Sequence, residues 1–151
     1  MAQKTPLLYE NVFSKSPEKI VGAQKKPTRV IIHLEYPGTL SEIPAGTTFY
    51  VGEQIKIRGI LEWQDATGVW RAVAGTKPLK FYHRVNTGAW ELIATKNQIF
   101  TPGVSLTYAD VDPYTLAVAG NHSFYVEFEG DAEYVGCGKE AKSFARKCSV
   151  C

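Results

Sequence analysis

Short runs of alternating apolar and polar residues cover most of the chain between residues 29 and 135. In the first run, Val30, Ile32 and Leu34 share one face, and His33 and Glu35 lie on the other. A period of two is typical of a β-strand with one packed face and one wet face. Comparable runs predict about seven to nine strands, at residues 29–36, 47–51, 53–63, 69–73, 79–85, 89–95, 104–108 and 122–129, with a short piece at 134–135.

Turn residues separate these runs. The clearest hairpin joins 79–85 to 89–95 through Asn86-Thr87-Gly88, a three-residue turn that contains glycine. The strand near 104–108 is expected to end at Asp110-Val111-Asp112-Pro113, because proline cannot donate to a ladder. Many short strands of this spacing predict an all-β, two-sheet antiparallel sandwich.

A glycine inside the longest alternating run carries a more specific prediction. Gly59 follows Ile55 and Ile57 on the apolar face of 53–63. Because glycine contributes no side chain to a core, we expect a bulge or a close approach of another strand at this position.

The two ends lack sustained alternation. Residues 1–28 contain three prolines and five lysines, and we expect an extended basic arm. Residues 138–151 read as a short basic tail that contains cysteines; residues 139–147 are good helix formers over a span too short to be helical alone. The predicted organisation is therefore an arm at 1–28, a sandwich at 29–137 and a tail at 138–151.

Length and composition limit the functional classes. A chain of 151 residues with 44% hydrophobic content is long enough for one domain with a real core. No run approaches the roughly 20 apolar residues of a membrane-spanning helix. The formal net charge of +2 is too small to predict nucleic-acid binding by the sandwich.

The charge is unevenly distributed along the chain. Residues 1–29 contain six basic and two acidic residues. Residues 30–137 contain seven basic and twelve acidic residues, and residues 138–151 contain four basic residues and one acidic residue. Two basic ends thus flank an acidic middle, which indicates an interaction surface rather than a fold. One hypothesis is that the arm of one subunit adds to an edge strand of the next; the alternative is that both ends are solvated tails.

Several segments in order resemble the bacterial and archaeal Ig-like domains of adhesins, surface-layer proteins and phage structural proteins. The matching segments are Val51 to Leu61, Lys77 to Tyr82, Gly88 to Ile93 and Ala119 to Tyr134. Of these, Gly88 to Ile93 contains the family's G-x-W pattern. The resemblance covers about 90 residues and implies an Ig-like sandwich that binds or builds and rarely catalyses. An inter-sheet disulfide of the antibody type is not expected, since all three cysteines follow the predicted sandwich.

Exposed aromatic residues and the basic arm supply the candidate binding residues. Tyr82 and Tyr125 fall on faces shared with charged residues, and they would form a flat binding patch if their strands adjoin. The alternative is that a second layer covers both rings. Lys25 and Lys26 are the corresponding candidates in the arm.

The three cysteines leave several states open. Cys148 and Cys151 have the spacing of half a zinc site, which Cys137 and a histidine would complete. A disulfide from Cys137 to Cys148 or Cys151 is favoured over zinc, and unreactive thiols are the remaining reading. We expect no cofactor.

The sequence offers little for catalysis. His83 and His122 share faces with apolar residues and are expected to be partly buried and hydrogen-bonded. Ser123 follows His122 directly, but neighbours on a strand point to opposite faces and cannot act together. The acidic residues around Glu127 and Glu129 fit a solvated strand face better than a calcium site.

The leading functional hypothesis is therefore a non-catalytic structural or adhesive subunit of a larger protein assembly, which binds copies of itself or other subunits, in one version by exchange of the arm. A virion component or a surface filament is favoured. The first residues lack the apolar run of a standard signal peptide, which fits a virion component, whereas a surface filament would need an export route that the sequence does not show. The alternative is a monomeric accessory module that binds a ligand or a partner.

Overall fold

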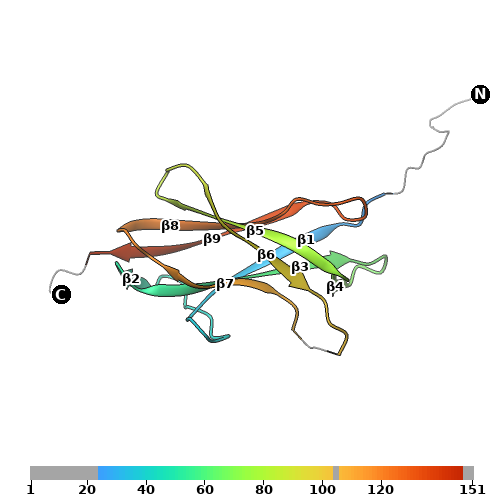
Figure 1. Cartoon of the computed structure of the whole chain (residues 1–151), viewed down its shortest axis with the longest axis horizontal. Helices are drawn as coiled ribbons and strands as arrows, with labels where there is room; N and C mark the ends of the chain where they lie inside the picture. Colours follow the sequence, from blue (N-terminus) through green and yellow to red (C-terminus); the bar gives the residue numbers. More distant parts are fainter. Residues whose placement is uncertain (1–23, 104–105, 148–151) are drawn as a thin grey trace, which may run out of the picture.

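Nine β-strands form the described part of the chain in a computed structural model that describes residues 24–103 and 106–147 (Figure 1). In chain order they are β1 (Thr28–Glu35), β2 (Thr48–Tyr50), β3 (Gln54–Gln64), β4 (Trp70–Ala72), β5 (Thr76–Val85), β6 (Glu91–Ile99), β7 (Ala109–Thr115), β8 (Gly120–Phe128) and β9 (Cys137–Arg146).

The strands make two sheets. In the smaller sheet β3 pairs with β1 on one side and with both β4 and β7 on the other. The larger sheet has the order β2-β9-β8-β5-β6. The predicted all-β two-sheet sandwich is confirmed. One pair departs from the antiparallel expectation: β2 runs parallel to β9, with Thr48 opposite Phe144, because the chain crosses between the sheets after β1.

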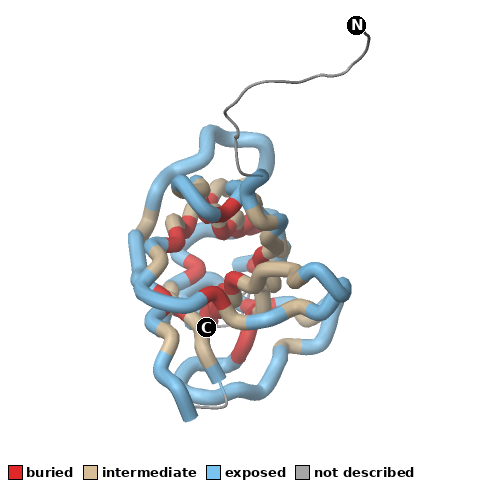
Figure 2. Tube along the Cα trace, turned by 90° about the vertical axis from the view of Figure 1, so that its right-hand side faces the viewer, coloured by how far each residue is buried: buried red, intermediate tan, exposed pale blue. Residues whose placement is uncertain are grey.

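The core lies between the sheets and consists of the inward side chains of their central strands. Ile55, Ile57 and Leu61 of β3 are completely buried, as are Phe124 and Val126 of β8. Figure 2 shows these buried segments lining the space between the two layers, with exposed loops around them.

The predicted close approach at the glycine of β3 is confirmed. A Cβ atom on Gly59 would lie 2.9 Å from Cγ1 of Val126 and 3.5 Å from both Leu79 and Phe81. These three side chains come from the opposite sheet, so the missing side chain lets the two sheets pack closely at this point.

The expected turn at Asp110–Pro113 is wrong, because these residues belong to β7. Proline is tolerated there for two reasons. The register with β3 shifts between Ile55 and Ile57, opposite Pro113, and β7 pairs with no strand other than β3 in the described chain.

The sandwich also extends past residue 137, where we expected the tail to begin. β9 runs from Cys137 to Arg146 and pairs with β8 along its whole length, from Phe128 opposite Cys137 to Gly120 opposite Ala145. Residues such as Ala141 and Lys142 form helices well in isolation, yet cross-strand packing on β8 outweighs this weak local preference.

Candidate functional site

The outer face of the larger sheet brings together the two tyrosines that the sequence singled out. Tyr82 of β5 lies directly opposite Tyr125 of β8 in the strand register. Their ring centroids are 6.3 Å apart and their planes are inclined by 49°. Both rings are partly exposed, so no second layer of the described chain covers them.

Trp90 and Arg84 extend this surface. The indole of Trp90 lies 5.9 Å from the ring of Tyr125, and the guanidinium of Arg84 sits 4.5 Å above the indole. Stacking of this kind holds an arginine at an aromatic face through its charge and its planar shape. We call Tyr82, Arg84, Trp90 and Tyr125 the aromatic patch.

Carboxylates border the aromatic patch. The aromatic patch, together with Glu127 and Glu140, lines a shallow pocket of about 370 Å³. The Tyr82 hydroxyl donates a hydrogen bond to Oε1 of Glu127 over 3.2 Å. Burial, and then the negative charge of Glu127, raise the pKa of Tyr82. The phenol therefore stays protonated and serves as a hydrogen-bond donor at neutral pH.

Local backbone features position these rings. A Cβ atom on Gly138 of β9 would collide with the hydroxyl of Tyr125, so this glycine gives the tyrosine room to lie across β9. At the turn before Trp90, Asn86 has a positive φ of 55°, and its side-chain carbonyl accepts a hydrogen bond of 3.0 Å from the Asn121 N–H. The turn is thereby fixed to the start of β8.

The sequence identified Tyr82 and Tyr125 but missed the residues around them. Arg84 and Glu127 each lie two positions from a tyrosine, so strand alternation places them on the same face. Trp90 was assigned to a strand, whereas it precedes β6 and folds over the sheet. Cross-strand contacts of this kind become visible only once the pairing of strands is known.

A surface of this composition is suited to binding. Tyrosine, tryptophan and arginine are the residues enriched at protein interfaces, and they supply most of the binding energy there. The Nε of Arg84 is buried and has no hydrogen-bond partner among the described residues. The patch thus offers apolar ring surface together with the charge of Arg84 to an incoming group.

The two histidines lie inside the sandwich instead, where they form a buried hydrogen-bonded chain. Nε2 of His83 is 2.8 Å from Nδ1 of His122, and the Tyr114 hydroxyl is 2.9 Å from Nδ1 of His83. Nε2 of His122 lies 2.7 Å from the carbonyl of Val118. The prediction of buried, hydrogen-bonded histidines is confirmed.

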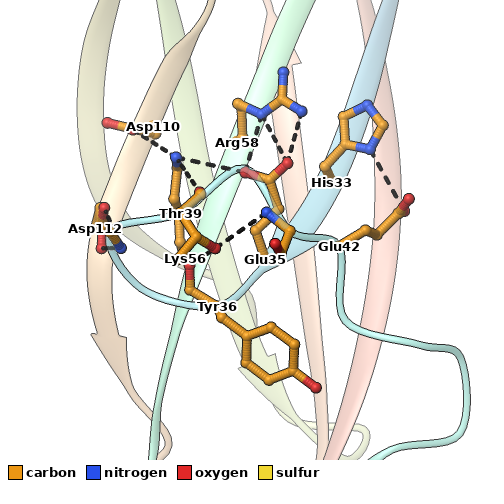
Figure 3. Close-up of polar contacts among 11 residues, drawn as sticks. His33, Glu35, Tyr36, Thr39, Glu42, Lys56, Arg58, Asp110 and Asp112 are labelled. Carbon is orange, nitrogen blue, oxygen red and sulfur yellow. Dashed lines mark hydrogen bonds and ion pairs between the residues drawn. The ribbon is translucent and has the colours of Figure 1, made fainter.

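A second polar cluster is buried on the outer face of the smaller sheet (Figure 3). Glu35 accepts hydrogen bonds from Nε and Nη2 of Arg58 at 2.6 to 3.0 Å, and the Lys56 ammonium lies 3.5 Å from the same carboxylate. Burial acts to raise the pKa of Glu35, but the bonds and charges of Arg58 and Lys56 outweigh it and hold that pKa below its usual range.

This charged cluster fixes the chain that follows β1. Lys56 Nζ donates to the carbonyl of Thr39 over 2.8 Å, and the Asp112 carboxylate accepts a 3.0 Å hydrogen bond from the Gly38 N–H. The charges satisfy one another and the loop, which indicates a structural anchor rather than a reactive centre.

Of the two arm lysines, one is built into the sandwich. The N–H of Lys26 donates to the carbonyl of Glu133 over 2.9 Å, and its carbonyl accepts a 2.9 Å hydrogen bond from Val135. Its ammonium contacts the Glu133 carboxylate at 2.7 Å and lies 4.9 Å from the Trp63 ring centroid. Lys25 is exposed. Neither lysine lies among the residues that line the pocket at the aromatic patch.

Cys137 is the cysteine that the structure describes; Cys148 and Cys151, and hence the proposed disulfide and zinc pairings, lie outside the described residues. Cys137 begins β9 and is partly buried, and burial raises the pKa of its thiol. Within residues 24–103 and 106–147, no three His, Cys, Asp or Glu side chains are grouped so that they could hold a metal ion. The same ranges contain no helix suited to crossing a membrane.

No known protein-family model matches the sequence, and no curated protein is significantly similar to it.

Proposed function

We propose that this chain is a non-catalytic, Ig-like structural subunit of a larger protein assembly, of the kind that builds a virion or a surface filament. The aromatic patch is the surface through which it contacts its partner. The observation that carries this proposal is the grouping of Tyr82, Trp90 and Tyr125 with Arg84 on one open sheet face.

The strand order supports the Ig-like part of the proposal. The succession β9-β8-β5-β6 in one sheet, opposite β1-β3-β7 in the other, corresponds to the arrangement of an Ig-like sandwich. Such sandwiches present flat sheet faces and edge strands that suit binding and assembly.

The arrangement of reactive groups supports the non-catalytic part. The histidines are buried within the core and bonded to Tyr114 and to a backbone carbonyl. No serine, threonine, cysteine or histidine of the described chain lines the pocket at the aromatic patch, whereas the common nucleophile–base pairs need such residues within hydrogen-bond reach.

The test is the mass of the full chain in solution, measured by size-exclusion chromatography with light scattering over a range of concentrations. We expect multi-copy species, and we expect Trp90→Ala combined with Tyr125→Ala to lower their mass. The matched control combines Val69→Ala with Val118→Ala, two exposed apolar positions away from the patch, and it leaves the mass unchanged. A wild-type chain that stays monomeric at every concentration contradicts the assembly.

A second candidate function is a monomeric accessory module that binds a protein or glycan through the same patch. The pocket favours it, because aromatic rings bordered by the carboxylates of Glu127 and Glu140 can stack on a sugar or peptide and accept its hydrogen bonds. A monomeric wild type whose tryptophan fluorescence changes on adding an oligosaccharide or a peptide, when that of Trp90→Phe does not, supports this reading.

A further inference from the structure

A groove runs along the side of the sandwich where β1 and β9 face each other. Its wider part has a volume of about 560 Å³ and it continues into a part of about 230 Å³. Its walls are polar and apolar in about equal measure: Leu34, Ile43, Ala141 and Phe144 supply apolar surface, and Glu42, Thr47 and Lys142 supply polar surface. Small side chains on β9, such as Ala141, leave this space open.

The strands beside the groove have backbone groups without a partner strand. In the described chain β1 pairs with β3 alone. On the side of β9 away from β8, β2 pairs only with Phe144–Arg146; β1 runs close to β9 there, but in the described chain residues 137–143 pair with no strand on that side. An extended peptide can add to an edge of this kind through its main chain while its side chains enter the groove.

The groove is already formed without an occupant. One wall is the segment after β1, and the charged cluster described above fixes that segment through Thr39 and Gly38 (Figure 3). The N–H of Ile43 donates to the carbonyl of Leu34 over 2.8 Å, which closes the loop at the groove itself. A preformed site avoids the free-energy cost of ordering a loop on binding.

We propose that residues 1–23 of one copy bind in this groove of a second copy as an extended strand. The inference rests on the proposed assembly function and names a contact for it. The segment has a suitable pattern, because Leu7, Tyr9 and Phe13 fall on one side of an extended chain and would face the apolar residues of the groove.

The direction of the chain favours a second copy over the same one. The start of the described chain leads into one end of β1, where Lys26 pairs with Tyr134 (Figure 1). The groove adjoins the other end of β1, near Leu34. Gln24 and Lys25 therefore lie at the end of β1 that is away from the groove of the same copy. Twenty-three extended residues span up to about 75 Å, enough to reach a neighbouring sandwich.

A donor segment at one end and an acceptor groove near the other make a head-to-tail contact. Contacts of this type close into rings or continue as open filaments, depending on the rotation between copies. The inference thus accounts for a filament or lattice with a single kind of subunit.

The experiment uses the full chain with Ala45→p-benzoylphenylalanine, a photoreactive side chain at an exposed position of the groove wall. Copies labelled with nitrogen-15 are mixed with unlabelled copies, irradiated and analysed by mass spectrometry of the cross-linked peptides. The matched control places the same residue at Ala66, an exposed position in the turn between β3 and β4. A second variant lacks residues 1–23 and keeps Lys26, so its contacts with Glu133 and Val135 are retained.

We expect cross-links from position 45 to residues 1–23 with mixed isotope content, and none to these residues from position 66. We also expect the shortened chain, which keeps the aromatic patch, to form species of lower mass than the wild type by light scattering. Cross-links of unmixed isotope content only, or none to residues 1–23, overturn the inference. A shortened chain that assembles to the wild-type mass overturns it too but leaves the assembly function standing, whereas a monomeric wild type refutes both.

Discussion

The side-chain amide of Gln98 is hydrogen-bonded to both backbone groups of Leu61, and so it ties β6 of one sheet to β3 of the other. Oε1 accepts from the Leu61 N–H over 2.8 Å, and Nε2 donates to the Leu61 carbonyl over 2.9 Å. On this side of β3, β7 ends its pairing at Gly59 and β4 begins at Glu62, so Leu61 falls in the gap. The amide takes the place of a strand there.

Replacing this amide is therefore expected to destabilise the fold. Gln98→Leu leaves both Leu61 groups buried without a partner, and we expect a loss of about 2–4 kcal/mol in the free energy of unfolding, measured by urea denaturation. Asn97→Ala, at the exposed neighbouring position, should change it by less than about 0.5 kcal/mol. Equal effects at the two positions would show that the amide bonds contribute nothing to stability.

Gln98 also shows where sequence reasoning stops. Alternation predicted the strands around the core because apolar side chains must face inward, and it placed Gly59 at a close contact. Alternation did not predict that Gln98, a polar residue near the end of β6, would be fully buried. Gln98 fills the gap between β7 and β4 along β3, and this gap exists only because β3 pairs with both of those strands. Information about pairing lies between distant segments, not within one run.

The candidate binding surface, too, was only partly predictable from the sequence. The faces of Tyr82 and Tyr125 follow from their own strands, but the contact of Trp90 with Tyr125 depends on the neighbouring order of β5 and β8 and on the space above Gly138. The strand at β9 was missed because its local preference is for helix, and its pairing with β8 outweighs that preference.

The buried chain of His83 and His122 predicts a stability that depends on pH. The Val118 carbonyl can only accept, so His122 carries its proton on Nε2 and its Nδ1 accepts from His83; His83 Nδ1 then accepts from Tyr114. Both imidazoles are satisfied when neutral. Burial and, to a lesser degree, His122 lower the pKa of His83 to about 4.

A histidine whose pKa is lowered in the folded state binds its proton more readily when unfolded. The contribution of the neutral His83 to the free energy of unfolding is therefore fully present above the unfolded pKa of about 6.5. It decreases by about 2–3 kcal/mol as the pH drops toward 4. We expect the melting temperature of His83→Phe to vary less than that of the wild type between pH 6.5 and 4. His33→Gln, at a partly exposed position, serves as the control and keeps the wild-type profile; identical profiles for His83→Phe and wild type would refute the assignment.

The glycine beneath Tyr125 allows the aromatic patch to be altered without the core. In Gly138→Ala, the new Cβ occupies the space of the Tyr125 hydroxyl, so the ring must move away from β9, and its contact with Trp90 changes. Because the displaced group is the end of a side chain, we expect less than about 1 kcal/mol of lost stability. Near-ultraviolet circular dichroism and the tryptophan fluorescence, to which Trp90 contributes, should change, while Lys139→Ala, at the exposed neighbouring position, should leave both spectra as they are.

The buried carboxylate of Glu35 supports a last prediction, because its two cationic partners are themselves buried. Glu35→Gln removes the charge that Arg58 and Lys56 share and leaves both cations in a low-dielectric site. We expect a loss of about 3–5 kcal/mol in the free energy of unfolding, measured by urea denaturation at pH 7. Glu62→Gln, which breaks the more exposed pair with Arg29, should cost less than about 1 kcal/mol.

The pKa of Glu35 is lowered in the folded state. The difference in the free energy of unfolding between wild type and Glu35→Gln is therefore complete above the unfolded pKa and shrinks as the pH falls through the folded pKa. A difference that grows on acidification would contradict this account of the cluster.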